Sequence, residues 1–359
     1  MVAKYQQIAD ELRQKINLQA FKMNEAIPSE AELQKQYEVS RHTIRQAIAL
    51  LVNEGYLRKE KGSGTYVDNV FKQVAHSFEE SKTIGVITTY VSDYIFPPII
   101  RGIENTLSKN GYSLLLASTN NNYQQEKECL EKMMQKNVQG LIIEPTKSNQ
   151  YNPNLALYTQ LREQGIPIVM INAAYEELNI PKISVNDELG GFLATDYLMK
   201  KNHRNILLIT KIDDLQGKYR MKGFIRASEE NKIMFKSENI MTYTTETKNE
   251  ILSQAVDQIE TYHFTGVVCY NDELASELNQ KLIEKNFNIP DDISIIGNDN
   301  STLGQMGSIA LTTLDHPKEG LGVDAANWIL QAIKLGSIQD DIIYTPQLLE
   351  RSSVKKINN

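Results

Sequence analysis

Polar and charged side chains recur directly after the short apolar runs in the last three quarters of the chain. They are Thr89, Tyr90, Asp93, Glu144, Lys147, Asn172, Asp213, Asp214, Asn271, Asp272 and Asp299. Carboxylates and amides supply the paired acceptors and donors that a hydroxyl-rich ligand such as a sugar needs. The cation of Arg220 is suited to bridging the acids, and the rings of Tyr94 and Phe96 offer faces for sugar C–H groups.

A helix-capping role competes with ligand binding for the acids in this set. Asp or Asn after a strand often caps the next helix, and this is the expected role of Asp272. For Asp213 both roles stay open. Because several strand ends carry the same chemistry at once, the set as a whole favours a ligand site at the carboxyl ends of strands.

A second group of candidate residues stands near position 40. Ser40 is expected to cap a helix whose inward-facing apolar positions are Ile44, Ala47, Ile48 and Leu51. The outward-facing residues near the start of that helix are Arg41, His42, Thr43, Arg45 and Gln46. In the major groove of DNA, Arg pairs with guanine and Gln with adenine, while Thr and His take phosphates or base edges. This set indicates DNA recognition.

The elements around this helix fit a helix-turn-helix followed by a wing. Apolar residues every four positions predict an amphipathic helix at the start of the chain. Ser29 and Glu32 form a capping box at the start of a second, short helix. Tyr56–Glu60 and Thr65–Val67 flank the glycine-rich tip Lys61–Gly64, which predicts a two-stranded hairpin whose backbone can approach DNA closely.

Charge and cysteine content narrow the class of protein. Residues 1–70 hold ten Lys and Arg against nine Asp and Glu, and the remainder holds 28 against 36, so the basic character of the first segment lies in its clusters. Cys129 and Cys269 lack the neighbours of a disulfide framework or zinc site, so no metal is expected. The chain begins without an apolar signal core and has no run of about 18 apolar residues. We therefore expect a cytoplasmic protein with no membrane span.

Apolar strands alternate with helices from residue 84 to residue 296, which is typical of parallel sheets covered on both faces. Residues 69–81 show no steady periodicity and predict a linker. The sequence thus predicts a DNA-binding domain over 1–68, a linker over 69–81, and a two-lobed α/β domain over 82–359. We expect the first lobe to take about 82–184 and 316–340, and the second about 185–315 and 341–356.

Three runs, Ile27–Leu33, Tyr37–Ala47 and Gly62–Val67, resemble the winged helix-turn-helix domain of the GntR family of bacterial transcription regulators over residues 4–67. The resemblance implies an α+β head and a homodimer on double-stranded operator DNA. It also implies that Arg41 and Arg45 contact base edges and phosphates, and that the wing enters the minor groove. The implied DNA contacts are Lys4, Ser29, Glu30, Arg41, His42, Thr43, Arg45, Gln46, Lys61 and Gly62.

The rest of the chain resembles the sugar-binding domain of LacI/GalR-type repressors, which is similar to periplasmic binding proteins, over about 82–354. The carriers include Gly140–Glu144, Arg220–Phe224, Cys269–Ala275 and Ile289–Asp299. Asn298 stands where the family usually has Tyr in Gly-Tyr-Asp. Together with the aromatic and polar residues noted above, the resemblance gives the expected effector contacts Thr89, Tyr90, Asp93, Phe96, Glu144, Lys147, Asn172, Arg220, Asn271, Asp299 and His316.

A GntR-type head on a LacI-type body is similar to the L-arabinose-responsive repressors of Gram-positive bacteria. Further runs that carry this likeness are Thr88–Pro97, Ser118–Asn122, Glu144–Ser148 and His316–Pro317. The likeness implies a transcriptional repressor of sugar utilisation genes that leaves its operator when L-arabinose binds between the lobes. It implies no cofactor. The identity of the sugar rests on resemblance alone, and a regulator of the same architecture that responds to another sugar stays an alternative.

Two other classes of protein compete with this interpretation. An enzyme is disfavoured because no GxGxxG follows the first strand and no phosphate-binding loop or GxSxG motif is present. The five histidines are scattered, and no catalytic residue is expected. A transport binding protein fits the two-lobed body, but it needs a signal peptide where this chain has a DNA-binding segment.

Overall fold

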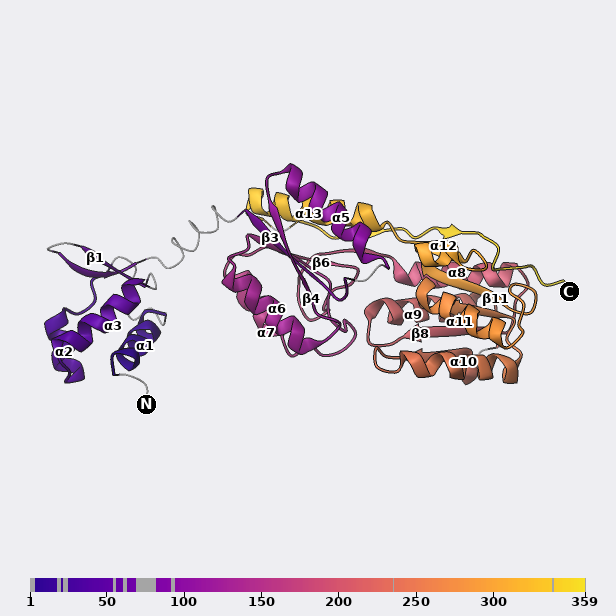
Figure 1. Ribbon diagram of the computed structural model, residues 1–359, viewed down its shortest axis with the longest axis horizontal. Coiled ribbons are helices and arrows are strands. Elements are labelled where there is room, and N and C mark those ends of the chain that lie inside the picture. Colours follow the sequence, from indigo (N-terminus) through magenta and orange to yellow (C-terminus); the bar gives the residue numbers. More distant parts are fainter. Residues whose placement is uncertain are drawn as a thin grey trace. The chain divides into compact units, whose positions relative to one another are not determined.

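The computed structural model describes residues 4–17, 21, 25–53, 56–60, 63–68, 82–91, 94–234, 236–337 and 339–358. The chain divides into two compact units, Met1–Ser81 and Lys82–Asn359 (Figure 1). The predicted linker, residues 69–81, lies outside the described residues.

The first unit is built from three helices and a hairpin. They are α1 (Lys4–Asn17), α2 (Glu30–Tyr37), α3 (Arg41–Asn53), β1 (Leu57–Glu60) and β2 (Gly64–Val67). The two strands pair antiparallel, with Leu57 opposite Val67. Leu12, Leu33 and Ile44, one from each helix, are buried in a common core because the apolar stripe of each helix faces inward. The predicted winged helix-turn-helix architecture is confirmed.

The first lobe of the second unit is a parallel sheet with helices on both faces. Its elements are β3 (Thr83–Thr88), α5 (Phe96–Lys109), β4 (Ser113–Ser118), α6 (Tyr123–Gln135), β5 (Gly140–Ile143), α7 (Leu155–Glu163), β6 (Ile168–Ile171), β7 (Lys182–Val185), α13 (Lys318–Leu335) and β13 (Ile342–Tyr344). The strand order is β4-β3-β5-β6-β7-β13. Helices α5 and α13 cover one face and α6 and α7 the other (Figure 1).

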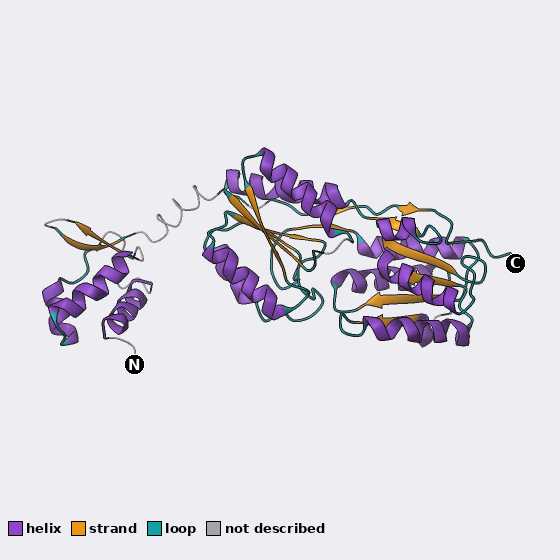
Figure 2. Ribbon diagram, viewed as in Figure 1, coloured by secondary structure: helices purple, strands orange, loops and turns teal. Residues whose placement is uncertain are grey.

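The second lobe repeats this plan. Its elements are α8 (Asp187–Lys200), β8 (Ile206–Lys211), α9 (Leu215–Glu230), the 3-10 turn η1 (Ser237–Asn239), β9 (Ile240–Tyr243), α10 (Lys248–Tyr262), β10 (Gly266–Cys269), α11 (Asp272–Glu284), β11 (Ser294–Asp299), α12 (Thr302–Met306), β12 (Thr312–Asp315) and β14 (Leu348–Leu349). The strand order is β9-β8-β10-β11-β12-β14, with only β14 antiparallel to its neighbour among these strands. Figure 2 shows the strands of each lobe enclosed between helices. The predicted two-lobed α/β fold with parallel sheets is confirmed.

The structure differs from the expected division into lobes near the C-terminus. Ile342–Tyr344 pairs in parallel with Ile183–Val185 in the sheet of the first lobe, although the sequence placed 341–356 in the second. The chain therefore enters the second lobe between β13 and β14. The strands β7, β13 and β14 were not predicted. β13 and β14 have only three and two residues, and β7 contains Lys182 and Ser184, so it lacks the continuous apolar run that indicated β5, β6 and β10.

Within the described ranges, no helix is long and apolar enough to cross a membrane. The same ranges hold no group of three or more His, Cys, Asp or Glu residues placed to bind a metal ion. Cys129 and Cys269 are both free thiols.

Candidate functional site

A cavity of about 380 Å³ lies between the two lobes of the second unit and is lined by residues of both. Nine of the eleven predicted effector contacts line it: Thr89, Tyr90, Phe96, Glu144, Asn172, Arg220, Asn271, Asp299 and His316. Lys147 is not among the lining residues, and Asp93 lies outside the described residues. The strand ends that the sequence singled out thus converge on one space, as parallel strands require.

Glu144, which directly follows β5, joins the ends of three neighbouring strands. The backbone N–H of Thr89 donates to Glu144 Oε2 at 2.9 Å, and the Thr89 hydroxyl donates to the same oxygen. Asn172 Nδ2 donates to Glu144 Oε1 at 2.7 Å. Burial raises the pKa of Glu144, and these hydrogen bonds offset only part of that rise. The carboxyl group is therefore a fixed acceptor in the wall of the first lobe.

His316 extends this chain of hydrogen bonds to the connection between β12 of the second lobe and α13 of the first. Since the Asn172 amide nitrogen faces Glu144, its Oδ1 accepts from His316 Nε2, at 3.1 Å. Burial lowers the pKa of His316 to about 4, so the ring is neutral at pH 7 and its Nδ1 carries a lone pair. That buried Nδ1 has no hydrogen-bond partner among the described residues. It offers an acceptor to a ligand hydroxyl.

Arg220 supplies the cation in the second-lobe wall. Its Nε donates to Asp187 Oδ1 at 2.9 Å, and Nη2 donates to Asp299 Oδ1 at 3.4 Å. Nη1 donates to the carbonyl oxygen of Tyr270, and the guanidinium carbon lies 5.1 Å from the centre of the Tyr270 ring. Burial acts to lower the pKa of Arg220, but Asp187 and Asp299 raise it above its ordinary value. The guanidinium group stays charged and fixed in orientation.

The close approach of α8 and α9 allows Asp187 and Arg220 to form an ion pair. A Cβ on Gly191 would lie 2.1 Å from the carbonyl oxygen of Arg220, and a Cβ on Gly223 would lie 2.0 Å from that of Glu188. Real Cβ atoms essentially never come within 3.0 Å of another atom, so only glycine allows this helix packing. Asp187 at the start of α8 is thereby held beside Arg220 on α9.

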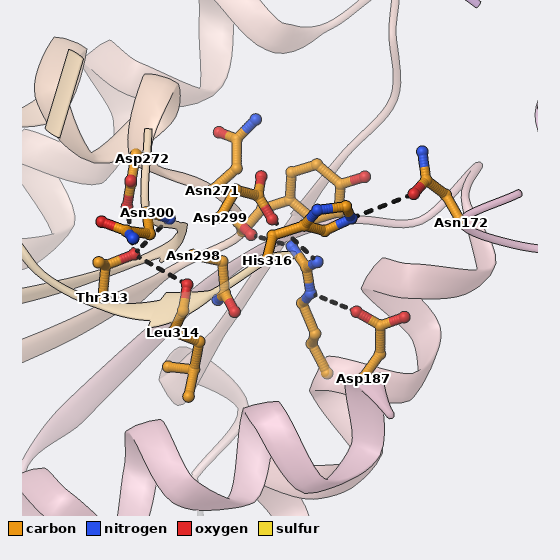
Figure 3. A network of polar contacts seen from close by, with 12 residues as sticks. Asn172, Asp187, Asn271, Asp272, Asn298, Asp299, Asn300, Thr313, Leu314 and His316 are labelled. Carbon is orange, nitrogen blue, oxygen red and sulfur yellow. Dashed lines mark hydrogen bonds and ion pairs between the residues drawn. The ribbon is translucent and has the colours of Figure 1, made fainter. Parts of the chain in front are cut away.

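Asp299 ends β11 in a backbone conformation that is unusual for a residue with a side chain. Its φ is 90°, and that of Asn300 is 47°. Such conformations persist where neighbouring contacts hold them. Lys318 Nζ, at the start of α13, donates to the carbonyl oxygens of Asp299 at 2.7 Å, Asn300 at 3.1 Å and His316 at 3.1 Å. This corner aims the Asp299 carboxylate at Arg220, and Figure 3 shows it beside His316 and Asn271.

Tyr94 links the two lobes at this corner. It stands just before α5 in the first lobe, and its hydroxyl donates to Asp299 Oδ2 at 2.7 Å in the second. The Tyr94 hydroxyl oxygen also lies 3.2 Å from the carbonyl oxygen of Asn298 and accepts from the backbone N–H of Asp272 at 3.1 Å. Burial and the adjacent Asp299 raise the pKa of Tyr94 well above its ordinary value, so the hydroxyl keeps its proton.

The capping role expected for Asp272 is wrong, because the cap of α11 is Asn271. Asn271 Oδ1 accepts from the backbone N–H of Leu274 at 2.9 Å. Asp272 is instead fully buried, where it accepts from the Thr313 hydroxyl (Figure 3) and from the backbone N–H of Ser301, each at 2.7 Å. Burial raises its pKa to about 7. Its contacts anchor the loop that follows Asp299.

Asp213 does not cap the next helix either, because the N-cap position of α9 is Asp214. The buried Asp213 carboxylate accepts from the backbone N–H of Thr245 at 2.9 Å and from its hydroxyl at 2.7 Å. Asp214 lines the cavity, where it pairs with Lys211 at 2.6 Å and accepts from the Tyr270 hydroxyl at 3.1 Å. Asp213 therefore holds the loop after β9, whereas Asp214 faces the cavity.

Polar contacts close the rim of the cavity between the lobes. Asn121 Nδ2 donates to Thr245 Oγ1 at 2.7 Å, and the backbone N–H of Leu215 donates to Ser148 Oγ at 2.9 Å. Further contacts across the rim are Asn149 with Ile212 and Asp213, Glu176 with Lys218 and Tyr219, and Lys147 with Glu246. The predicted effector contact Lys147 thus belongs to the rim. The lobes stand in a closed arrangement.

The sequence missed several residues that line the cavity. They are Ile95, Asn121, Pro145, Val185, Asp187, Lys211, Gln216, Tyr243, Thr245, Lys248, Tyr270 and Glu273. Asp187 follows β7, a strand of four residues, so no strand end marked it in advance. Gln216 lies inside the first turn of α9, and only its spacing of four residues from Arg220 placed it on the same helix face.

The first unit presents its predicted DNA contacts on and around α3. Lys4, His42 and Gln46 are exposed, and the side chains of Arg41 and Arg45 are 73% and 64% exposed. The cap of α3 is Ser40, whose Oγ accepts from the backbone N–H of Thr43 at 3.2 Å. Lys61 and Gly62, at the tip of the wing, lie outside the described residues. The start of α3 thus carries two exposed guanidinium groups, both close to the Glu30 carboxylate.

Ser29 and Glu30 start the helix before α3, and both carry local contacts. The predicted capping box is confirmed, because the backbone N–H of Glu32 donates to Ser29 Oγ at 3.3 Å and the backbone N–H of Ser29 donates to Glu32 Oε2 at 2.8 Å. Glu30 pairs with Arg41 at 3.2 Å and with Lys59 of β1 at 3.4 Å. Burial acts to raise the pKa of Glu30, but these two cations lower it below its ordinary value. Glu30 therefore joins the recognition helix to the wing.

Comparisons with known proteins agree with both units. Residues 4–67 match the bacterial regulatory proteins of the gntR family, and residues 195–354 match the periplasmic binding protein-like domain. The chain is 45% identical to an arabinose metabolism transcriptional repressor of Geobacillus stearothermophilus, over 99% of this chain and 98% of that protein. It is 42% identical to a repressor of the same description from Halalkalibacterium halodurans, over 98% and 97% of the two chains. A solved LacI family transcriptional regulator from Enterococcus faecium with bound ribose is 26% identical, with a TM-score of 0.67 over 77% of this chain and all of that one.

Proposed function

Because this chain belongs to the family of arabinose metabolism transcriptional repressors, we propose that it represses sugar utilisation genes and leaves its operator when L-arabinose binds in the cavity. The observation that carries the proposal is the cavity itself. Acidic, amide and basic groups of the two lobes line it, so a ligand bound there has polar partners in both walls. Such paired donors and acceptors suit a polyhydroxylated ligand.

Within the cavity, we assign the two walls different parts in sugar binding. Glu144 is held by hydrogen bonds from the first lobe, and Arg220 and Asp299 are held in the second. Because the groups are fixed before binding, little side-chain entropy is lost when a sugar contacts them. A sugar that bridges Glu144 to Asp299 favours the closed arrangement of the lobes over an open one.

The first unit carries the proposed DNA contacts. Arg41 and Arg45 are exposed at the start of α3, where a recognition helix enters the major groove. Of the ten DNA contacts predicted from the sequence, eight are described. Lys4 begins α1, Ser29 and Glu30 stand at the start of α2, and Arg41, His42, Thr43, Arg45 and Gln46 lie in the first turns of α3. We propose that two copies of the chain bind adjacent half-sites as a homodimer, since operators of such proteins mirror a two-fold axis.

The proposal requires no catalytic residue, metal or cofactor, and it places the protein in the cytoplasm with its DNA. The relatives named above are transcriptional regulators. A test for turnover of L-arabinose by the purified chain checks the non-enzymatic assignment, and release of any product would contradict it.

The decisive experiment measures binding to the DNA upstream of sugar utilisation genes at a stated salt concentration, with L-arabinose and then other pentoses added. Salt must be fixed because phosphate contacts dominate the affinity. We expect tight, specific binding that L-arabinose releases. Linkage further requires that operator DNA weaken the binding of L-arabinose by the factor by which L-arabinose weakens operator binding. Equal sugar affinities with and without operator would refute the mechanism.

A further inference from the structure

Gln216 carries a buried acceptor that the contacts described so far do not use. Its Oε1 is buried, and no described residue donates a hydrogen bond to it. The residue lines the cavity. Buried polar atoms in folded proteins are normally paired, and an unpaired one calls for an explanation.

Contacts of the residues on either side of Gln216 hold the start of α9 in place. The backbone N–H of the preceding Leu215 donates to Ser148 Oγ across the rim, at 2.9 Å. Behind it, a Cβ on Gly217 would lie 1.7 Å from the carbonyl oxygen of Lys211, so α9 packs directly on the end of β8. The backbone on either side of Gln216 is therefore held in place at the cavity wall.

The neighbouring cation does not satisfy this acceptor. Arg220 lies one turn further along the same face of α9, but its guanidinium group donates to Asp187, Tyr270 and Asp299. The other buried cavity acceptor with no partner among the described residues is His316 Nδ1. Two residues from different elements of the cavity wall thus carry acceptors that no described residue pairs with, and a ligand hydroxyl can donate to each of them.

On the premise of the proposed function, we propose that the carboxamide of Gln216 accepts a hydrogen bond from one hydroxyl of the effector and makes that hydroxyl a requirement for binding. Neither strand-end spacing nor family resemblance pointed to this residue. Sites built around a buried polar group reject analogues that lack the matching hydroxyl, because the group is then left unpaired. Gln216 is therefore a specificity-determining contact.

The test is calorimetric binding of L-arabinose and its 2-, 3- and 4-deoxy forms to the full-length chain and to Gln216→Leu. We expect the unaltered chain to bind one deoxy form about ten-fold or more weakly because its lost hydroxyl faces Gln216. In Gln216→Leu the loss of affinity for that deoxy form, relative to L-arabinose, falls to within two-fold. Any loss of affinity for the other two deoxy forms stays as in the unaltered chain. A role in packing alone weakens all four sugars by the same factor, and that result overturns the proposal.

Two further variants serve as controls for this experiment. Gln216→Ala repeats it with a smaller side chain, so that crowding by Leu is separated from loss of the amide. Gln254→Leu makes the same replacement at an exposed position on α10 and should bind all four sugars as the unaltered chain does. Selective loss of the same deoxy penalty in both position-216 variants supports the assignment, and retention of that penalty in either of them overturns it.

The same experiment separates this proposal from the choice of sugar. If the unaltered chain binds D-ribose or D-xylose but not L-arabinose, the proposed effector is wrong, and the deoxy forms of the sugar that binds decide the role of Gln216. If no pentose binds, both proposals fail.

Discussion

The hydroxyl of Tyr94 is expected to contribute to cleft closure without contributing to the stability of either lobe. It bonds across the lobes to Asp299 Oδ2 at 2.7 Å and to the backbone N–H of Asp272 at 3.1 Å. In an open arrangement both partners and the hydroxyl exchange these bonds for water. Tyr94→Phe therefore acts on the closed state alone, and the ring that packs beside α5 is kept.

The magnitude follows from the charge of Asp299. A hydrogen bond to a charged group is worth roughly 1.5–3 kcal/mol, which corresponds to about a ten- to 150-fold change in an equilibrium constant. Since sugar binding requires closure, the affinity of Tyr94→Phe for L-arabinose should fall by this factor. Operator affinity without sugar should stay within about two-fold of that of the unaltered chain. The thermal unfolding midpoint should stay within about 2 °C of its value in the unaltered chain.

Titration calorimetry with L-arabinose and gel-shift titration with operator DNA measure the two effects separately. Tyr151→Phe is the matched control, because Tyr151 lies in the first lobe and is 76% exposed. The reasoning is refuted if Tyr94→Phe binds L-arabinose as the unaltered chain does. It is equally refuted if the variant loses operator binding in the absence of sugar.

Three further predictions concern the head, the cavity and the rim. Arg45→Ala should weaken specific operator binding by about 1–3 kcal/mol and relax base preference, measured by competition with base-substituted operators; a uniform loss on all sequences contradicts base contact. His316 has a pKa of about 4 in the fold against about 6.5 unfolded, so its contribution to stability is present above pH 6.5 and falls by about 2 kcal/mol towards pH 5. Urea unfolding should show this loss in the unaltered chain and less of it in His316→Gln. Lys147→Ala should raise the Kd for L-arabinose by only about two- to five-fold, because its partner Glu246 is 61% exposed. A hundred-fold loss of affinity would indicate instead that Lys147 contacts the sugar.

Local signals carried most of the fold prediction. The Ser29–Glu32 capping box is a contact over three residues, so its sequence pattern determines it. Strand ends likewise placed Glu144 and Asp299 correctly on the cavity, because each lies at the carboxyl end of a parallel strand in the sheet of its own lobe. What the sequence could not predict depends on contacts between distant segments. Asp187 reaches Arg220 only because two helices approach at glycines.

The same distinction explains why the predicted cap of α11 was wrong. Asn271 and Asp272 both follow β10, and local rules allow either to cap α11. Asp272 is drawn inward because Thr313 and the backbone of Ser301 donate to its carboxylate, and these partners lie 41 and 29 residues away in the chain. Asn271 is then left to cap the helix and to face the cavity. The choice between two neighbours is made by tertiary donors that no local pattern contains.

The rim contacts bear on how much free energy the effector must supply. To move a two-state equilibrium from 1:99 to 99:1, a ligand needs about 5.5 kcal/mol of preference for one state. Hydrogen bonds such as those of Asn121 with Thr245 and of Ser148 with Leu215 exist only when the lobes are closed, and they reduce the preference that the sugar itself must provide. Loss of such a contact should therefore raise the sugar concentration at which the operator is released, and should leave operator affinity without sugar unchanged. Loss of Arg220 should instead remove the sugar response, because the cation holds Asp187 and Asp299 in place for the ligand.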